Sequence, residues 1–123
     1  MANPVVHWEL WSEDPKRASD FYSKVFGWSI RHIPEMDYHF AEKGGDGGIG
    51  GGIMKPKEGP WPGKLTVYID VDDLAAAREK ILAAGGTMVV EPTEVPGVGS
   101  MALFEDPDGR VMGLWKQNSP QGG

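Results

Sequence analysis

Hydrophobic and polar residues follow each other along the chain in an order that predicts a strand, a helix and three more strands. Residues 5–11 are rich in β-forming side chains and predict the first strand. Asp14 and Pro15 predict the start of a helix, because Asp is a preferred cap and Pro is favoured at the first helical position. Apolar residues then recur at helical spacing until Gly27, which predicts the helix end. Further strands are predicted at residues 28–33, 38–42 and 49–54.

The same order of elements recurs in the second half of the chain. A strand is predicted at residues 64–71, a helix capped by Asp72 or Asp73 and ending at Gly85-Gly86, and strands at 87–90, 100–104 and 111–115. A spacing of 59 positions relates Asp14 to Asp73, and the same spacing relates Gly27 to Gly86. The pattern therefore predicts an α+β fold of two βαβββ modules that form a concave, partly open mixed sheet with the helices outside.

This repeat also predicts the domain organisation. We expect a single domain over residues 1–123, with module one at 5–54, a linker at 55–63, module two at 64–117 and a flexible tail at 118–123. A ferredoxin-like fold is the alternative, but the additional strands at 38–42 and 100–104 count against it.

Alternation within the strands predicts which side chains face the helices. We expect Leu65, Val67 and Ile69 on the helix side, and the helix residues Phe21, Tyr22, Val25, Leu74, Ile81 and Leu82 in the core. The opposite face would then carry the ligand-binding residues His7, Glu9, Trp11, Thr66, Tyr68, Asp70 and Trp115. Aromatic walls with a few polar groups are typical of a small-molecule pocket.

The composition of the chain argues against several classes of function. The chain has 123 residues, 40% of them hydrophobic, and contains no cysteine, which excludes disulfides and thiolate metal sites. A net charge of -6 argues against nucleic-acid binding, because it repels phosphates. The sequence has no apolar run long enough to span a membrane, and its first residues do not resemble a signal peptide. We therefore expect a cytoplasmic protein with neither nucleic-acid nor membrane partners.

Several short motifs together are similar to those of a known family. They are HWEL at 7–10, DP at 14–15, FGW at 26–28, YIDVDDL at 68–74, AGG at 84–86, PGVG at 96–99 and DPDG at 106–109. In this order and spacing they resemble the vicinal-oxygen-chelate superfamily, which comprises the glyoxalase, bleomycin-resistance and extradiol-dioxygenase group. The resemblance covers residues 5–117 and implies a homodimer as the assembly.

The resemblance also implies where a metal would be bound. Metal-dependent members take four His, Glu or Gln ligands from equivalent strands of the two modules. Here His7 stands at the first position, Thr66 at the third and Gly113 at the fourth, and residues 47–54 contain no suitable side chain for the second. A single imidazole does not hold a divalent ion tightly. We therefore expect no metal ligand set and no cofactor beyond a weakly held divalent metal at His7, helped by Glu9.

The leading hypothesis is a small-molecule-binding protein of this superfamily, with an incomplete metal site and an apolar or aromatic ligand. The alternative is a glyoxalase-type lyase or isomerase that uses His7 and Glu9 as catalytic acid–base residues or as weak metal-binding residues. Trp61 is interpreted as a lid or an anchored loop residue, and His32 and His39 as surface strand residues. The glycine-rich strand near residues 49–53 would leave room for a ligand or for close approach of another backbone.

Overall fold

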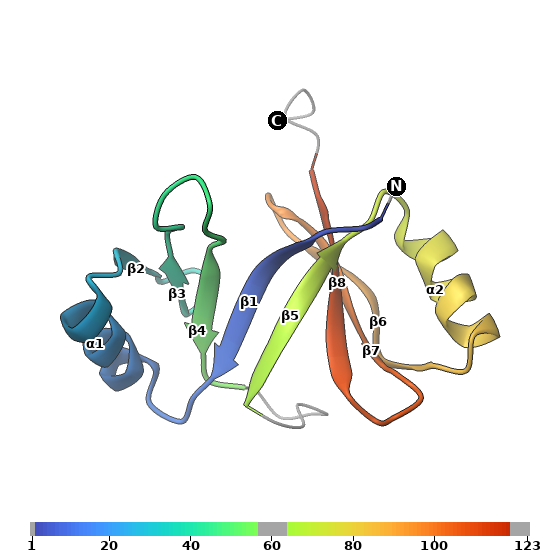
Figure 1. Cartoon of the computed structure of the whole chain (residues 1–123), viewed down its shortest axis with the longest axis horizontal. Coiled ribbons are helices and arrows are strands. Elements are labelled where there is room, and N and C mark those ends of the chain that lie inside the picture. Colours follow the sequence, from blue (N-terminus) through green and yellow to red (C-terminus); the bar gives the residue numbers. More distant parts are fainter. Residues whose placement is uncertain (1, 57–63, 119–123) are drawn as a thin grey trace. The chain divides into compact units, whose positions relative to one another are not determined.

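The computed structural model describes residues 2–56 and 64–118 (Figure 1). Its elements, in chain order, are β1 (Val5–Trp11), α1 (Pro15–Phe26), β2 (Ile30–Ile33), β3 (Tyr38–Ala41), β4 (Gly51–Met54), β5 (Leu65–Asp70), α2 (Leu74–Ala83), β6 (Thr87–Val95), β7 (Gly99–Glu105) and β8 (Val111–Gln117). The predicted α+β class and the repeated βαβββ order are confirmed. Neither helix of the described part is long and apolar enough to cross a membrane.

The chain forms two compact units, which we call the first unit (residues 6–67) and the second unit (residues 1–5 and 68–123). Strands of the first unit pair in the order β2-β3-β4-β1, with β4 and β1 parallel and the other pairs antiparallel. The second unit has the order β5-β8-β7-β6, with β5 and β8 parallel and the other pairs antiparallel. The two halves thus repeat one mixed-sheet topology.

Strand register shows which residues of the two units are equivalent. Glu9 of β1 is paired with Gly52 of β4, and Tyr68 of β5 is paired with Gly113 of β8. Glu9 and Tyr68 are related by the 59-residue spacing of the repeat. Gly52 therefore occupies in the first unit the place that Gly113 occupies in the second.

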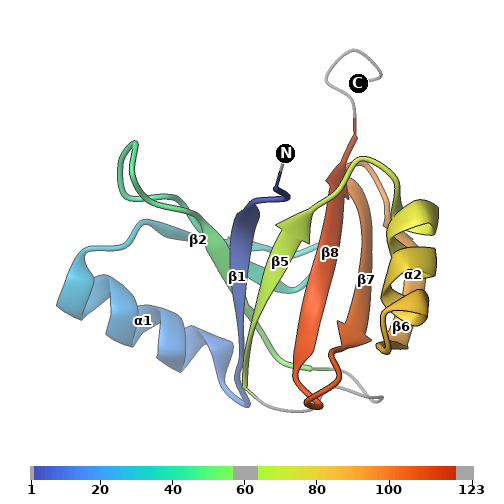
Figure 2. The ribbon, with the colours of Figure 1, turned by 45° about the vertical axis from the view of Figure 1, so that its right-hand side comes forward.

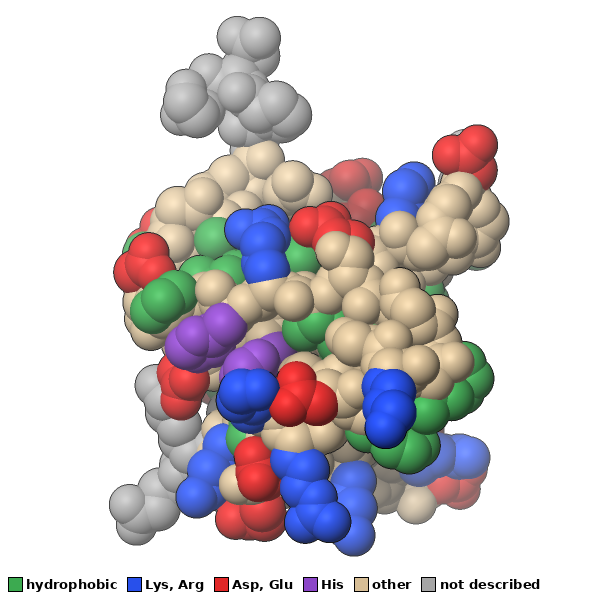
Figure 3. Space-filling view, turned by 90° about the vertical axis from the view of Figure 1, so that its left-hand side faces the viewer, with side chains coloured by type: hydrophobic (Ala, Val, Ile, Leu, Met, Phe, Trp, Pro, Cys, Tyr) green, Lys and Arg blue, Asp and Glu red, His purple; other side chains and the backbone are tan. Residues whose placement is uncertain are grey.

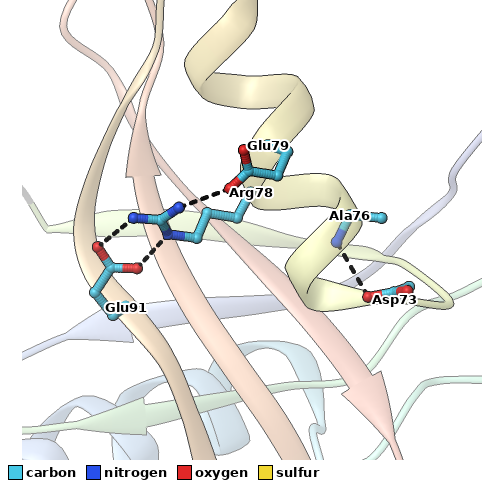
Figure 4. Close-up of polar contacts among 5 residues, drawn as sticks. All are labelled: Asp73, Ala76, Arg78, Glu79 and Glu91. Carbon is cyan, nitrogen blue, oxygen red and sulfur yellow. Dashed lines mark hydrogen bonds and ion pairs between the residues drawn. The ribbon is translucent and has the colours of Figure 1, made fainter.

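Both helices begin at the predicted caps. The Asp14 carboxylate accepts a hydrogen bond from the backbone N–H of Arg17 at 3.1 Å, and the Asp73 carboxylate accepts one from Ala76 at 3.0 Å (Figure 4). Gly27 ends α1 in the left-handed region, with φ 71°. In the second unit the left-handed residue is Gly85, with φ 99°, one position before the Gly86 that the repeat spacing predicts.

The core of the second unit lies between α2 and strands β6–β8 (Figure 2). Its buried residues are Leu74, Ala102 and Leu114, with Ile69 and Ile81 packed against them. An ion pair also connects α2 with β6. Arg78 of α2 donates to Glu91 of β6 at 2.6 Å and to Glu79 of its own helix at 2.9 Å (Figure 4).

The predicted core is wrong at three helix positions, which are exposed: Phe21 57%, Val25 54% and Leu82 40%. Leu65, which was expected on the helix side of its strand, is 62% exposed. In α1 the reason is the rotation of the helix about its axis. Ser19 is buried and Tyr22 half-buried, so the inward face lies to one side of the apolar stripe. Tyr22 stacks on Trp28 with 4.9 Å between ring centroids. Periodicity identifies an apolar stripe, but neighbouring elements decide which part of it is covered.

Strand β6 is longer than the predicted 87–90 and continues past Pro92 to Val95. Its register with β7 shifts between Met88 and Val90 and again between Val90 and Thr93. Such irregularities release individual residues from the hydrogen-bond ladder, so a proline without an N–H is tolerated there. The sequence prediction ended the strand too early because it had no means of locating these shifts.

Candidate functional site

Strand β1 sends its side chains to two faces of the first unit. Trp8 packs on Trp28 with 5.1 Å between centroids, and Trp28 in turn stacks on Tyr22 of α1. Trp8 therefore lies on the helix side of β1. Because side chains alternate along a strand, His7 and Glu9 lie on the face away from α1.

A buried carboxylate is the centre of this face. Glu9 is only 5% exposed. Its Oε1 accepts a hydrogen bond from the indole Nε1 of Trp11 at 2.8 Å, and its Oε2 accepts one from the hydroxyl of Tyr38, also at 2.8 Å. Burying an ionised group is costly unless donors replace its water. Two donors in good geometry supply that replacement, one on each oxygen.

The imidazole of His7 extends this network. Its Nε2 lies 2.7 Å from the hydroxyl oxygen of Tyr38. Tyr38 donates its single hydroxyl hydrogen to Glu9, so its oxygen accepts from an Nε2–H of His7. Burial lowers the pKa of His7 to about 4, so the ring is neutral at pH 7. The hydrogen bonds thus run in one direction, from His7 through Tyr38 to Glu9.

Tyr38 reaches this position because Gly52 has no side chain. A Cβ atom at Gly52 would overlap the ring and hydroxyl of Tyr38. On the opposite face of β4, a Cβ atom at Gly51 would overlap the indole of Trp8. The glycine-rich segment was expected to leave room for a ligand or for close approach of another backbone. Aromatic rings of the chain fill that room at Gly51 and Gly52. At Gly50 the second alternative holds, because a Cβ atom there would lie 2.9 Å from the backbone oxygen of Ala41.

Sequence reasoning missed Tyr38, because the pattern that points to it depends on the register of β3 with β4. Tyr38 stands two residues before Phe40, which is the direct partner of Gly52, so both aromatic side chains share the face of His7. Their rings lie 6.2 Å and 6.4 Å from the His7 ring. A glycine opposite such an aromatic pair indicates that one of the rings lies over the glycine.

Three of the residues predicted to bind a ligand lie in the second unit. Tyr68 is 5% exposed, and a Cβ atom at its partner Gly113 would overlap its ring. Asp70 pairs in register with Trp115, and its backbone N–H donates to the carbonyl of Pro4 at 2.9 Å.

Two further residues singled out in the sequence remain. Thr66, in the first unit, is buried at 3% exposure. Trp61 lies outside the described residues. Among the predicted site residues, the structure therefore joins His7, Glu9 and Trp11 in one hydrogen-bond network. Trp11 donates directly to Glu9, and His7 is connected to Glu9 through Tyr38.

Comparison with known proteins identifies relatives in sequence and in structure. A putative glyoxylase of Mycobacterium tuberculosis is 36% identical over 110 residues, which are 88% of this chain and 42% of the relative. An anthracycline biosynthesis protein of Streptomyces peucetius is 27% identical over 129 residues, covering 93% of this chain and 47% of the relative. The chain thus spans less than half the length of these two relatives.

A solved structure shares the fold. The crystal structure of methylmalonyl-CoA epimerase from Mycobacterium tuberculosis aligns with a TM-score of 0.70 at 16% identity, covering 98% of this chain and 92% of that one. The model of the Glyoxalase/Bleomycin resistance protein/Dioxygenase superfamily matches residues 5–112. The chain therefore belongs to this superfamily.

Proposed function

We propose that the chain is a small-molecule-binding member of its superfamily, with an incomplete metal site, and that it takes an apolar or aromatic ligand at the face of His7 and Tyr38. One observation carries this proposal. At equivalent positions of the two units the strand residue is a glycine, Gly52 or Gly113, and a tyrosine ring lies over it. Aromatic surface thus stands where the superfamily resemblance leads us to expect metal ligands.

The residues at the four expected ligand positions do not fit a metal. Gly52 and Gly113 have no side chain, and Thr66 offers only a hydroxyl. His7 directs Nε2–H toward Tyr38, so that nitrogen has no lone pair for an ion. Neighbouring Glu9 already accepts on both oxygens. Zinc sites use three or four protein ligands, and the four expected positions offer only one imidazole and one hydroxyl, so they fall short of a zinc site.

The chemistry of the face favours a flat apolar ligand. The carboxyl group of Glu9 already accepts a hydrogen bond on each of its oxygens. A ligand would therefore meet mainly the aromatic rings of this face, and flat aromatic molecules stack on such rings. One relative is named for anthracycline biosynthesis, and anthracyclines are flat aromatic molecules. This name supports the ligand class proposed for our chain.

The test follows the His7 imidazole and the Trp11 indole by NMR while probes are added to the full chain. Two flat aromatic probes, daunorubicin and 2-naphthol, should shift both resonances, and the Trp8 indole on the helix side of β1 serves as the internal control. One equivalent of Zn²⁺ should leave the His7 resonance in place. Tight zinc binding that is lost in a His7→Ala variant would overturn the proposal, as would resonances that respond to neither aromatic probe.

The second candidate is a lyase or isomerase with His7 and Glu9 as acid–base residues. The hydrogen-bonded path from His7 through Tyr38 to Glu9 favours it, since a proton could pass along this path. The lowered pKa of His7, about 4, counts against it, because an efficient general base has a pKa near the working pH. An NMR titration discriminates between the two. A pKa near 7 for His7 favours the enzyme, and a value near 4 favours the binding protein.

A further inference from the structure

The hairpin of β2 and β3 brings together three metal-ligating side chains that the network of Glu9 does not use. His32 and His39 are direct partners across the two antiparallel strands, and their rings lie 4.6 Å apart. Asp37 stands in the turn between the strands, in the left-handed region with φ 48°. The two histidines and the aspartate thus come from one short segment of the chain.

The spacing of their polar atoms is close to that of a coordination sphere. Nε2 of His32 lies 3.0 Å from Oδ1 of Asp37. One ligand atom from each of the three residues lies within 4.8 Å of the other two. Two ligand atoms on a tetrahedral zinc ion, each about 2.0–2.1 Å from the metal, are about 3.3 Å apart. The histidine–aspartate pair already meets this spacing, and a ligand atom of His39 lies within 4.8 Å of both partners.

This cluster faces away from the aromatic face described above. Tyr38 points toward His7, so the next residue of β3, His39, points to the opposite side. His32 and Asp37 are exposed and His39 is half-buried, so an ion could reach all three from solvent. Figure 3 shows histidine side chains lying together among charged groups on this surface.

We propose that His32, Asp37 and His39 bind a divalent transition-metal ion, with zinc as the reference ion. Two imidazoles and a carboxylate are ligands that zinc prefers, and three protein ligands leave one position for water or an external ligand. The chain contains no cysteine and three histidines, so two of its three imidazoles are in this cluster. A site on the surface with an open fourth position predicts an exchangeable ion rather than one locked into the fold.

The experiment is a zinc titration of the full chain by calorimetry, with the three histidine imidazoles followed by NMR. We expect one zinc ion per chain, with shifts at His32 and His39 and none at His7. Asp37→Asn should weaken binding by at least about tenfold, since even the loss of a partner that only orients a ligand costs about 10–100-fold. Asn also tolerates the left-handed turn, so this variant should keep the hairpin.

The matched control is Glu35→Gln, which removes the same charge from the same turn without touching the cluster. It should change zinc affinity by less than about twofold in physiological salt, where surface charges are screened. His32→Asn, at an exposed position, provides a second ligand deletion should Asp37→Asn disturb the hairpin. It should weaken binding as Asp37→Asn does.

Two results would overturn the proposal: His32 and His39 resonances that do not respond to zinc, or equal losses of affinity in Asp37→Asn and Glu35→Gln. A zinc response at His7 would contradict the proposed function, whether or not His32 and His39 respond. The two proposals therefore fail separately.

Discussion

The fit of Tyr38 over Gly52 can be tested by adding one methyl group at position 52 of β4. In a Gly52→Ala variant the new Cβ atom would overlap the tyrosine ring and hydroxyl. Carbon atoms in contact lie about 3.5–4.0 Å apart, so the ring must move by more than about 1 Å. That movement takes the hydroxyl away from Glu9, now at 2.8 Å, and from His7, now at 2.7 Å.

The size of the effect follows from the two hydrogen bonds. A hydrogen bond to a charged group contributes about 1.5–3 kcal/mol, and one between neutral groups about 1 kcal/mol. Replacing Gly by Ala returns about 0.4–1 kcal/mol, because the unfolded chain loses conformational freedom. We therefore expect Gly52→Ala to lower the free energy of unfolding by roughly 2–3 kcal/mol. Domains of this size are stable by about 5–15 kcal/mol, so the variant should still fold.

The assay is urea unfolding followed by circular dichroism, on a double-mutant cycle with Tyr38→Ala. Once the ring is absent, the three atoms nearest to the new Cβ atom are gone, and Gly52→Ala should cost little. The coupling energy should then be close to the whole effect of the single variant. Gly44→Ala is the control, because a Cβ atom there meets no other atom within 4 Å. It should stay within about 0.5 kcal/mol of the parent.

The reasoning would be refuted by a Gly52→Ala cost that persists unchanged when Tyr38 is absent. It would also be refuted by equal costs for Gly52→Ala and Gly44→Ala. Either result would mean that the glycine serves the backbone of β4 and not the tyrosine ring.

Three further predictions concern stability. The folded-state pKa of His7, about 4, lies below its ordinary 6.5, so the unfolded chain binds more protons between these values. Stability should therefore fall by up to roughly 3 kcal/mol as pH drops from 6.5 to 4, and urea unfolding of His7→Gln should lack this component. Trp11→Phe removes one donor from the buried Glu9 and should cost about 1.5–3 kcal/mol in the same assay; an unchanged midpoint would contradict the network. Backbone N–H donors, that of Arg110 foremost, lower the pKa of Asp106. Asp106→Asn should therefore lower the melting temperature in calorimetry at pH 7, and this difference should vanish at a pH well below 3.8, where the parent carboxyl is also neutral.

The parts of the fold that depend on local rules could be predicted from the sequence. Asp14 and Asp73 cap the helices because a carboxylate satisfies the first free N–H groups wherever it occurs. Alternation along β1 correctly places His7 and Glu9 on one face and Trp8 on the other. The family resemblance, carried by the order of short motifs, is confirmed as well.

The parts that depend on contacts between distant residues could not be predicted. Ser19 is buried and Phe21 is exposed because the elements packed against α1 determine how the helix is rotated about its axis. The spacing of apolar residues along the sequence does not reveal that rotation. Sequence reasoning likewise had no access to the register of β4, so it could not say which residue stood at the second expected ligand position. The pairing of Gly52 with Glu9 makes Gly52 the equivalent of Gly113, the fourth ligand position that the resemblance implies. Tyr38 was missed for the same reason, since its role requires the register of β3 and β4 together.

Strand β4 constrains which sequence changes the protein can accept one at a time. A glutamate at position 52 would supply a side chain of the kind that the superfamily resemblance implies for a metal ligand, but it would overlap the ring of Tyr38. A smaller residue at position 38 would make room for it, at the cost of the partner shared by His7 and Glu9. Each change is therefore unfavourable without the other. A glutamate can therefore be introduced at this position, in evolution or in the laboratory, only through a variant that has first lost stability, so the effects of the two substitutions depend on each other.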